Sequence, residues 1–225
     1  MQPNTKFWGQ ASRPEERMRG NLVPSHPLFG GGAAAPELPP EVTLQHGIAW
    51  TLADYEALPA DGQRYELLDG VLRVTPAPSP DHQSANGWLA FYLIQHIQVP
   101  GKGRVFSAPI DVELGPKSIV QPDLVVLLRD SAATVTARRI VGPPDLVVEI
   151  TSPSTASYDR REKRDLYAAV GVREYWLVDP GTRSVELLCL EHGSYHAEYV
   201  YTGQAIVPSR VIVGWNVTTA ALFVG

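Results

Sequence analysis

The sequence of 225 residues contains one cysteine, Cys189, so no disulfide can form within the chain. Cys189 lies in an apolar, strand-like run, and we interpret it as a small buried hydrophobic residue. No apolar run approaches the ~20 residues that a membrane-spanning helix needs, and the N-terminus has no hydrophobic region typical of a signal peptide. These absences favour a cytoplasmic protein without a membrane partner.

The sequence also lacks a positive net charge. Its 19 lysine and arginine residues are outnumbered by 24 aspartate and glutamate residues, which gives a formal net charge of −5. This balance excludes a generally basic protein surface, so any contact with nucleic acid must be local. The hydrophobic content of 44% is sufficient for one ordinary core.

The first part of the chain differs in composition from the rest. Residues 1–45 hold seven of the 20 prolines, the run Gly30–Ala35 and few aliphatic residues. Such a segment cannot bury enough apolar surface to offset the entropy lost on ordering. We therefore predict a flexible tail over residues 1–45 and a folded domain over residues 46–225.

Two short aliphatic runs each carry one carboxylate. The run Val120–Leu128 contains Asp123, and the run Asp145–Ile150 contains Glu149. Near-continuous aliphatic runs of this length are typical of strands that are covered on both faces. An ionised carboxylate in such a strand costs several kcal/mol unless a cation or hydrogen bonds compensate it. We therefore expect the two carboxylates to share a partner.

A lysine on the following helix is the candidate partner. The pattern predicts a helix from about Tyr158 to Val170, with Ser157 as its N-cap, that ends at Gly171. Lys163 has apolar residues at i+3, i+4 and i+7, so it lies on the inward face. Two carboxylates and one inward lysine indicate a metal-dependent hydrolytic site. Oxygen ligands favour Mg²⁺, Mn²⁺ or Ca²⁺ over zinc.

Two further polar residues lie in predicted elements. A sharp turn signal joins the strand-like runs Arg64–Leu68 and Val71–Thr75 into a hairpin, and Glu66 lies in the first of them. By its position alone, Glu66 is a solvated strand residue. His82 begins the apolar face of a helix predicted over Asp81–Gln98. It is either a capping or packing histidine, or a polar residue at the mouth of the metal site.

The remaining elements complete a mixed α/β sheet, which is all that periodicity by itself predicts. Pro122 cannot donate to a strand ladder, so it marks an edge or a bulge. The other expected elements are a helix at Leu52–Leu58 capped by Thr51, one strand over Arg104–Leu114, strands at Glu174–Val178 and Val185–Leu190, hairpin-like strands to about Val213, and a helical turn at Thr218–Phe223.

These residues also resemble a known family. Pro122-Asp123, Glu149 and Lys163 resemble the PD-(D/E)xK nuclease superfamily, in a variant whose lysine has moved from the strand to the next helix. More narrowly, the chain resembles the Uma-type family of putative restriction endonucleases from roughly Leu52 to Leu190. The blocks that carry this resemblance are Tyr65–Gly70, Ser79–Gln83, Val120–Asp123, Pro144–Ile150, Ser152–Thr155, Asp159 with Glu162–Arg164, and Glu174–Pro180.

The resemblance implies a fold of the α/β (α+β) class, with a restriction endonuclease-like αβββαβ core. To this core the residue patterns described above add a mixed sheet, an extra N-terminal hairpin and C-terminal β-strands. Glu66 then becomes a candidate active-site acid rather than a solvated residue. Family analogy and the apolar C-terminal strands predict a homodimer. A molecular mass from light scattering that corresponds to a monomer would contradict this prediction.

The chemistry expected of such a site is the hydrolysis of DNA phosphodiester bonds. Asp123 and Glu149 would hold Mg²⁺ or Mn²⁺, with Glu66 contributing directly or through water. Lys163 would position or deprotonate the attacking water and stabilise the developing charge. Gln121, beside the acid, would orient substrate or water.

Candidate DNA contacts come from the lysine helix and from the loop before the second carboxylate strand. Charge runs are usually solvated faces, and no recognition helix or zinc motif is visible, so the sequence does not indicate specificity for a DNA sequence. The candidates are Arg160, Arg161, Arg164, Arg138 and Arg139.

Two alternatives stay open. In a non-catalytic dimeric scaffold or nucleic-acid-binding protein, Lys163 would form a structural salt bridge with Glu149 or Asp123 and hold no metal. Such a protein should tolerate Lys163→Ala, whereas a nuclease should not. A glycosidase-like carboxylate pair is the other alternative, but it needs no inward lysine, and no aromatic residues cluster near these acids.

Overall fold

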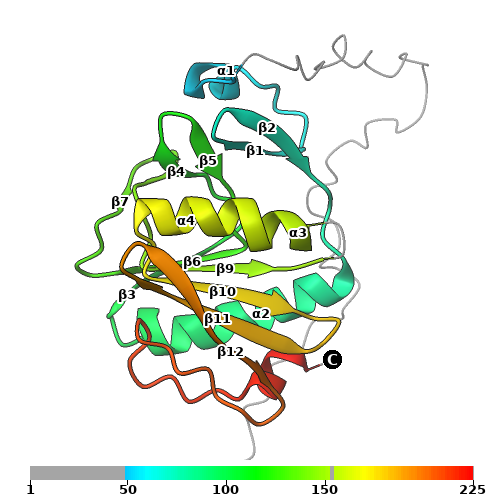
Figure 1. Ribbon diagram of the computed structural model, residues 1–225, viewed down its shortest axis with the longest axis vertical. Helices are drawn as coiled ribbons and strands as arrows, with labels where there is room; N and C mark the ends of the chain where they lie inside the picture. Colours follow the sequence, from blue (N-terminus) through cyan, green and yellow to red (C-terminus); the bar gives the residue numbers. More distant parts are fainter. Residues whose placement is uncertain (1–48, 153–154, 225) are drawn as a thin grey trace, which may run out of the picture. The chain divides into compact units, whose positions relative to one another are not determined.

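The computed structural model describes residues 49–152 and 155–224, and the tail predicted over residues 1–45 lies outside them. The residues that it describes form one compact unit (Figure 1). Its helices are α1 (Leu52–Glu56), α2 (Pro80–Leu93), the π-helical η2 (Ile94–Gln98), α3 (Ala156–Tyr158), the π-helical η3 (Asp159–Lys163), α4 (Arg164–Val170) and the 3₁₀-helical η4 (Thr219–Phe223).

One six-stranded sheet forms the centre of this unit and has the order β12-β11-β10-β9-β6-β3. Its β9 and β10 are parallel and the other neighbours are antiparallel, so the sheet is mixed, as expected. The strands are β3 (Gly103–Ser107), β6 (Leu124–Leu128), β9 (Leu146–Ile150), β10 (Glu174–Asp179), β11 (Ser184–Glu191) and β12 (Ser194–Thr202).

A second six-stranded sheet has the order β2-β1-β5-β4-β8-β7. It contains the predicted N-terminal hairpin, in which Asp69 and Gly70 both have positive φ, as a tight two-residue turn requires. The strands are β1 (Arg64–Leu68), β2 (Val71–Thr75), β4 (Val112–Gly115), β5 (Ser118–Val120), β7 (Thr134–Val135) and β8 (Ile140–Val141).

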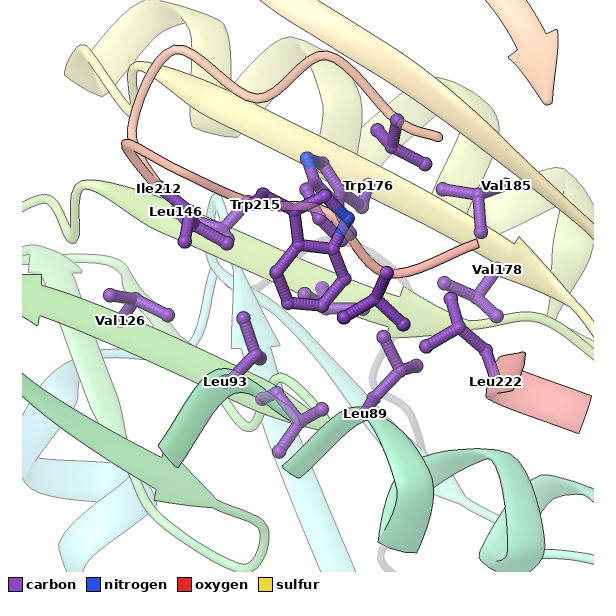
Figure 2. Packing of buried hydrophobic residues seen from close by; sticks show 14 of the residues in the cluster. Leu89, Leu93, Val126, Leu146, Trp176, Val178, Val185, Ile212, Trp215 and Leu222 are labelled. Carbon is purple, nitrogen blue, oxygen red and sulfur yellow. The ribbon is translucent and has the colours of Figure 1, made fainter. Parts of the chain in front are cut away.

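The central sheet is covered on both faces. Alternate residues of β6, β9 and β10 point to opposite sides, where one apolar cluster contains α2 and the other contains α4 (Figure 1). Figure 2 shows Leu89 and Leu93 of α2 packed toward Trp176 and Trp215. Fully burying one such side chain stabilises the fold by about 1.5–3 kcal/mol. The order α2, β3, β6, β9, α3 to α4, β10 confirms the predicted αβββαβ core.

Two predicted strands are each divided by a proline. The single strand predicted over Arg104–Leu114 is wrong, because the chain leaves β3 before Pro109 and returns as β4 in the other sheet. The run Val120–Leu128 likewise divides into β5 and β6 around Pro122. Proline lacks the N–H that a strand ladder needs. Pro122 therefore marks a crossing between the two sheets rather than a bulge within one.

The lysine helix begins earlier than predicted. Thr155, not Ser157, occupies the N-cap position, and the helix runs through a π-helical turn, η3, that carries Lys163. It ends at Gly171 in the left-handed conformation, with φ of 92°, as predicted. Single π-helical turns inside helices are frequent at functional sites.

Other predictions are confirmed with small shifts. Thr51 caps α1 through a capping box, Cys189 is buried, and η4 is the predicted C-terminal turn. The C-terminal strands end at Thr202, so their predicted extension to about Val213 is wrong. Within the described ranges, no helix has the length and apolar character to cross a membrane.

Candidate active site

The predicted acids and lysine meet at one cavity of about 230 Å³. It lies where the ends of β6 and β9, the strand β1, the start of α2 and the helix α3 to η3 come together. The residues that line it are Arg64, Glu66, Thr75, Pro76, Ala77, Pro78, Ser79, His82, Asp123, Glu149, Ile150, Ser152, Thr155, Tyr158, Asp159 and Lys163.

Asp123 is held at the junction of the two central strands. Because Leu124 pairs with Val148, Asp123 lies beside Glu149, as the sequence predicted. Its Oδ2 accepts a hydrogen bond from the Ile150 N–H at 2.8 Å and lies 3.1 Å from His82 Nε2. Its Oδ1 accepts no hydrogen bond from the residues that the structure describes. One oxygen is therefore anchored and the other is available to a ligand.

Lys163 bridges two carboxylates from different sheets. Its Nζ lies 2.9 Å from Glu149 Oε1, 3.0 Å from Glu66 Oε1 and 3.7 Å from Asp159 Oδ1. The Tyr167 hydroxyl also donates to Glu149 Oε1, at 2.8 Å. The lysine therefore fixes the two glutamates relative to each other across the cavity.

Like Asp123, Glu66 and Glu149 each have one carboxylate oxygen with protein partners and one without a donor among the described residues. Glu66 Oε1 also accepts a hydrogen bond from the Gln121 main-chain N–H at 2.7 Å. The second oxygens, Oε2 of Glu66 and Oε2 of Glu149, accept no hydrogen bond from residues 49–152 and 155–224. All three acids line the cavity. Each acid is thus fixed through one oxygen and leaves the other without a protein donor.

The site carries more carboxylates than cations. Burial raises the pKa of Glu149 well above its usual range; Lys163 opposes this, and Asp159, Asp123 and Glu66 add to it. Burial raises the pKa of Asp159 in the same way, again opposed by Lys163. Both shifts express the cost of crowding negative charge into a poorly hydrated space. Additional positive charge in the cavity would relieve that cost.

Lys163 experiences the opposite balance. Burial by itself would lower the pKa of its ammonium group, but Glu149, Glu66 and Asp159 outweigh burial and raise that pKa well above the usual value. Lys163 therefore stays a charged ammonium group, which donates hydrogen bonds and does not accept a proton. The geometry thus favours its positioning and charge-stabilising role over proton abstraction from water.

The donor set suits a hard divalent cation. No group of three or more His, Cys, Asp or Glu side chains in the described part of the chain has an arrangement that could hold an ion. Mg²⁺, however, is usually bound through one or two carboxylates together with waters and substrate phosphates. Asp123 and Glu149, each with a free oxygen at the cavity, match that pattern.

Five predicted site residues line the cavity, namely Glu66, His82, Asp123, Glu149 and Lys163. Gln121 does not line it. Its main-chain N–H donates to Glu66, and its side-chain amide donates to Asp111 Oδ1 at 2.8 Å.

The arginines proposed for DNA contact do not line the cavity. Arg160 hydrogen-bonds Glu186, and Arg164 donates to the Tyr195 carbonyl at 3.0 Å. Arg139 is buried in ion pairs with glutamates, so it is unavailable to DNA. Arg138 and Arg161 are exposed at the surface.

The sequence analysis gave no site role to several residues that line the cavity, or to Tyr167, which does not line it but hydrogen-bonds Glu149. Asp159 and Tyr167 lie four positions before and after Lys163, so helical spacing contained the signal for both. Arg64 lies two positions before Glu66 and therefore on the same side of β1. Tyr158 also lines the cavity, and the guanidinium of Arg73 lies 4.4 Å from its ring centroid, a contact between distant parts of the chain that helical spacing does not reveal.

Comparison with known proteins assigns the chain to a family. The model of the Uma2 family, described as putative restriction endonuclease, matches residues 52–220. Among solved structures, a putative nuclease belonging to DUF820 from Anabaena variabilis superposes with a TM-score of 0.65 at 19% identity, covering 77% of this chain and 97% of that one. This similarity shows a common fold. No curated protein matches the sequence. With its restriction endonuclease-like fold, the chain belongs to the Uma2 family of putative restriction endonucleases.

Proposed function

We propose that this protein is a metal-dependent endonuclease that hydrolyses DNA phosphodiester bonds. The observation that carries the proposal is the convergence of Glu66, Asp123 and Glu149 on one cavity, each with one oxygen that no described residue occupies. Membership of a family of putative restriction endonucleases supports a nucleic-acid substrate.

Asp123 and Glu149 would hold Mg²⁺ or Mn²⁺, with Glu66 contributing through a water molecule, because the three acids are not arranged to bind one ion together. Bound there, the ion would polarise the phosphate and lower the pKa of a coordinated water. The excess of carboxylates over cations around the cavity is the electrostatic reason for a cation to bind.

The protein groups around these acids would orient them and bind the phosphate. Lys163 ties Glu149 to Glu66 and, as an ammonium group, would stabilise negative charge that develops on the phosphate. His82 supports Asp123 through Nε2, at 3.1 Å. Its role is thus to position an acid.

The test is a calorimetric titration of Mg²⁺ and Mn²⁺ into the wild type and Asp123→Asn, beside cleavage assays on single-stranded, double-stranded and branched DNA. Asparagine keeps the size of Asp123 and an acceptor for the Ile150 N–H, but removes the charge. We expect both metal binding and metal-dependent cleavage in the wild type, and loss of both in the variant. A wild type that binds neither ion and cleaves none of the DNAs would contradict the proposal.

The bridge made by Lys163 supports a second candidate, a non-catalytic scaffold that keeps the fold. A lysine at 2.9 Å and 3.0 Å from two glutamates is already a closed ion-pair network. Lys163→Ala is then a poor discriminator, because it leaves buried carboxylates unpaired in either kind of protein. Metal titration separates the two candidates, since only the nuclease requires the ion.

The homodimer stays a prediction. Tyr199 and Val200, which are exposed on the edge strand β12, are apolar residues to which a second copy of the chain would bind.

A further inference from the structure

Arg64 is a cation of the cavity that the proposed chemistry does not yet use. It is the first residue of β1, and its side chain is 22% exposed at the cavity wall. The side chain of Lys163, the other cation, is surrounded by three carboxylates and is 5% exposed. Of the two, Arg64 is therefore the one more open to a ligand.

Gln121 holds the guanidinium of Arg64 from one side. Arg64 Nη2 donates to the Gln121 carbonyl at 2.8 Å, and Nε donates to Gln121 Oε1 at 3.4 Å. Gln121 is itself fixed, because its N–H donates to Glu66 and its amide donates to Asp111. The guanidinium is thus positioned by a network that starts at one of the active-site acids.

The guanidinium of Arg64 has N–H groups that do not donate to Gln121. Arginine carries five N–H donors, and within the described chain only the two directed to Gln121 make hydrogen bonds. Arg64 Nη1 lies 3.9 Å from Asp123 Oδ1, which is beyond hydrogen-bond distance. The donors that remain include both on Nη1, the nitrogen nearest the acid that would hold the metal.

We propose that Arg64 binds a phosphate group of the nucleic-acid substrate and that Gln121 positions it. This inference rests on the proposed nuclease function. A planar guanidinium presents parallel N–H donors that match two oxygens of one phosphate. A phosphate held there lies next to Asp123, where the bond to be cleaved must be. Gln121 then acts through Arg64 and Glu66 rather than on the substrate.

The direct test is binding of short fluorescent single-stranded and duplex DNA, measured by anisotropy in EDTA so that no turnover occurs. We expect Arg64→Ala to weaken binding about 10- to 100-fold, as loss of hydrogen bonds to a charged group implies. Arg64→Lys should recover part of it, because lysine restores the charge without the paired donors. The matched control is Arg173→Ala, which removes an arginine 3.2 Å from Asp145, at the opposite end of β9.

A calorimetric Mg²⁺ titration separates phosphate binding from a purely structural role. Removing a cation 3.9 Å from Asp123 should leave Mg²⁺ affinity unchanged or raise it, because like charges repel. If Arg64→Ala weakens Mg²⁺ and DNA binding together, Arg64 only keeps Gln121 and Glu66 in place, and the inference is overturned. If Arg64→Ala binds and cleaves DNA as well as the wild type does, the inference about Arg64 is overturned and the nuclease proposal stands. If the wild-type protein neither binds nor cleaves DNA, the inference and the nuclease proposal are both overturned.

Discussion

Two buried glutamates on neighbouring strands differ in how fully they are hydrogen-bonded. Glu149 of β9 and Glu174 of β10 are 4% and 1% exposed and lie in the same parallel pair of strands. Both oxygens of Glu174 accept hydrogen bonds, from the main chain of Arg210–Val211 and from the side chains of Trp176 and Ser209. Glu174 thus anchors the C-terminal segment to the sheet.

Only one carboxylate oxygen of Glu149 accepts hydrogen bonds from the described residues. Its Oε1 accepts from Lys163 and Tyr167, while Oε2 accepts from no residue that the structure describes. Buried polar groups are normally satisfied, so an incompletely bonded carboxylate at a cavity calls for an explanation. Burial alone does not distinguish Glu149 from Glu174, but the number of oxygens without a donor does. Under the proposed function, the second oxygen of Glu149 would bind the metal ion.

The largest effect expected from this comparison is on cleavage. Glu149→Gln should reduce metal-dependent DNA cleavage about 1,000-fold or more, because an active-site metal supplies several kcal/mol of transition-state stabilisation. Its unfolding free energy should stay close to that of the wild type, since glutamine keeps an acceptor for the Tyr167 hydroxyl and for Lys163, and Lys163 keeps two other carboxylates as counter-charges. Steady-state kinetics and urea unfolding measure the two effects.

The matched variant Glu174→Gln should show the reverse pattern. It replaces one of two fully bonded oxygens by an amide nitrogen that donates, so buried donors lose their acceptor, and each costs about 1–3 kcal/mol when left unsatisfied. Cleavage per folded molecule should be unchanged. Comparable losses of cleavage in both variants, at equal folded fraction, would break the distinction between the two glutamates.

A smaller effect is expected from removing the shared cation. Lys163→Met should lower the unfolding free energy by about 3–5 kcal/mol, because it leaves Glu66 and Glu149 buried without their partner. Saturating Mg²⁺ should restore part of that loss, since an ion bound only to the folded state stabilises it. Thermal unfolding with and without Mg²⁺ measures both, and a variant as stable as the wild type without metal would show that the bridge contributes nothing.

The smallest effect tests the hydroxyl that supports Glu149. Tyr167→Phe removes the 2.8 Å hydrogen bond to Glu149 and should lower the unfolding free energy by about 0.5–1.5 kcal/mol. Tyr195→Phe removes a hydrogen bond of the same length to the Val172 carbonyl, away from the acids. We expect similar losses of stability, with weaker Mg²⁺ binding only for Tyr167→Phe. Equal Mg²⁺ affinities would show that Tyr167 serves packing alone.

Much of the fold could be predicted because its signals are local. The Asp69-Gly70 turn, the Thr51 cap and the stop at Gly171 each depend on residues within one turn of chain. The inward position of Lys163 followed from helical spacing. These features need no knowledge of distant partners.

The sequence analysis selected Glu149 as a site residue, but periodicity does not explain why Glu174 is different. Both lie in aliphatic strands, and three of the four donors that saturate Glu174 come from residues 35 to 37 positions later. Likewise, Glu66 meets the Gln121 N–H across a separation of 55 residues. Contacts at that separation depend on how the sheets pack, and periodicity contains no information about them.

The sequence by itself determined a mixed α/β sheet and the residues that carry charge inside it, because alternation, helical spacing and turn residues are encoded locally. The resemblance to a known family added the expectation of an αβββαβ core. Only the tertiary structure decided that prolines split two runs between two sheets, that Arg160 and Arg164 are engaged elsewhere, and that Arg64 faces the acids. The physical reason is that a buried charge acquires its role from the donors and charges that packing brings to it.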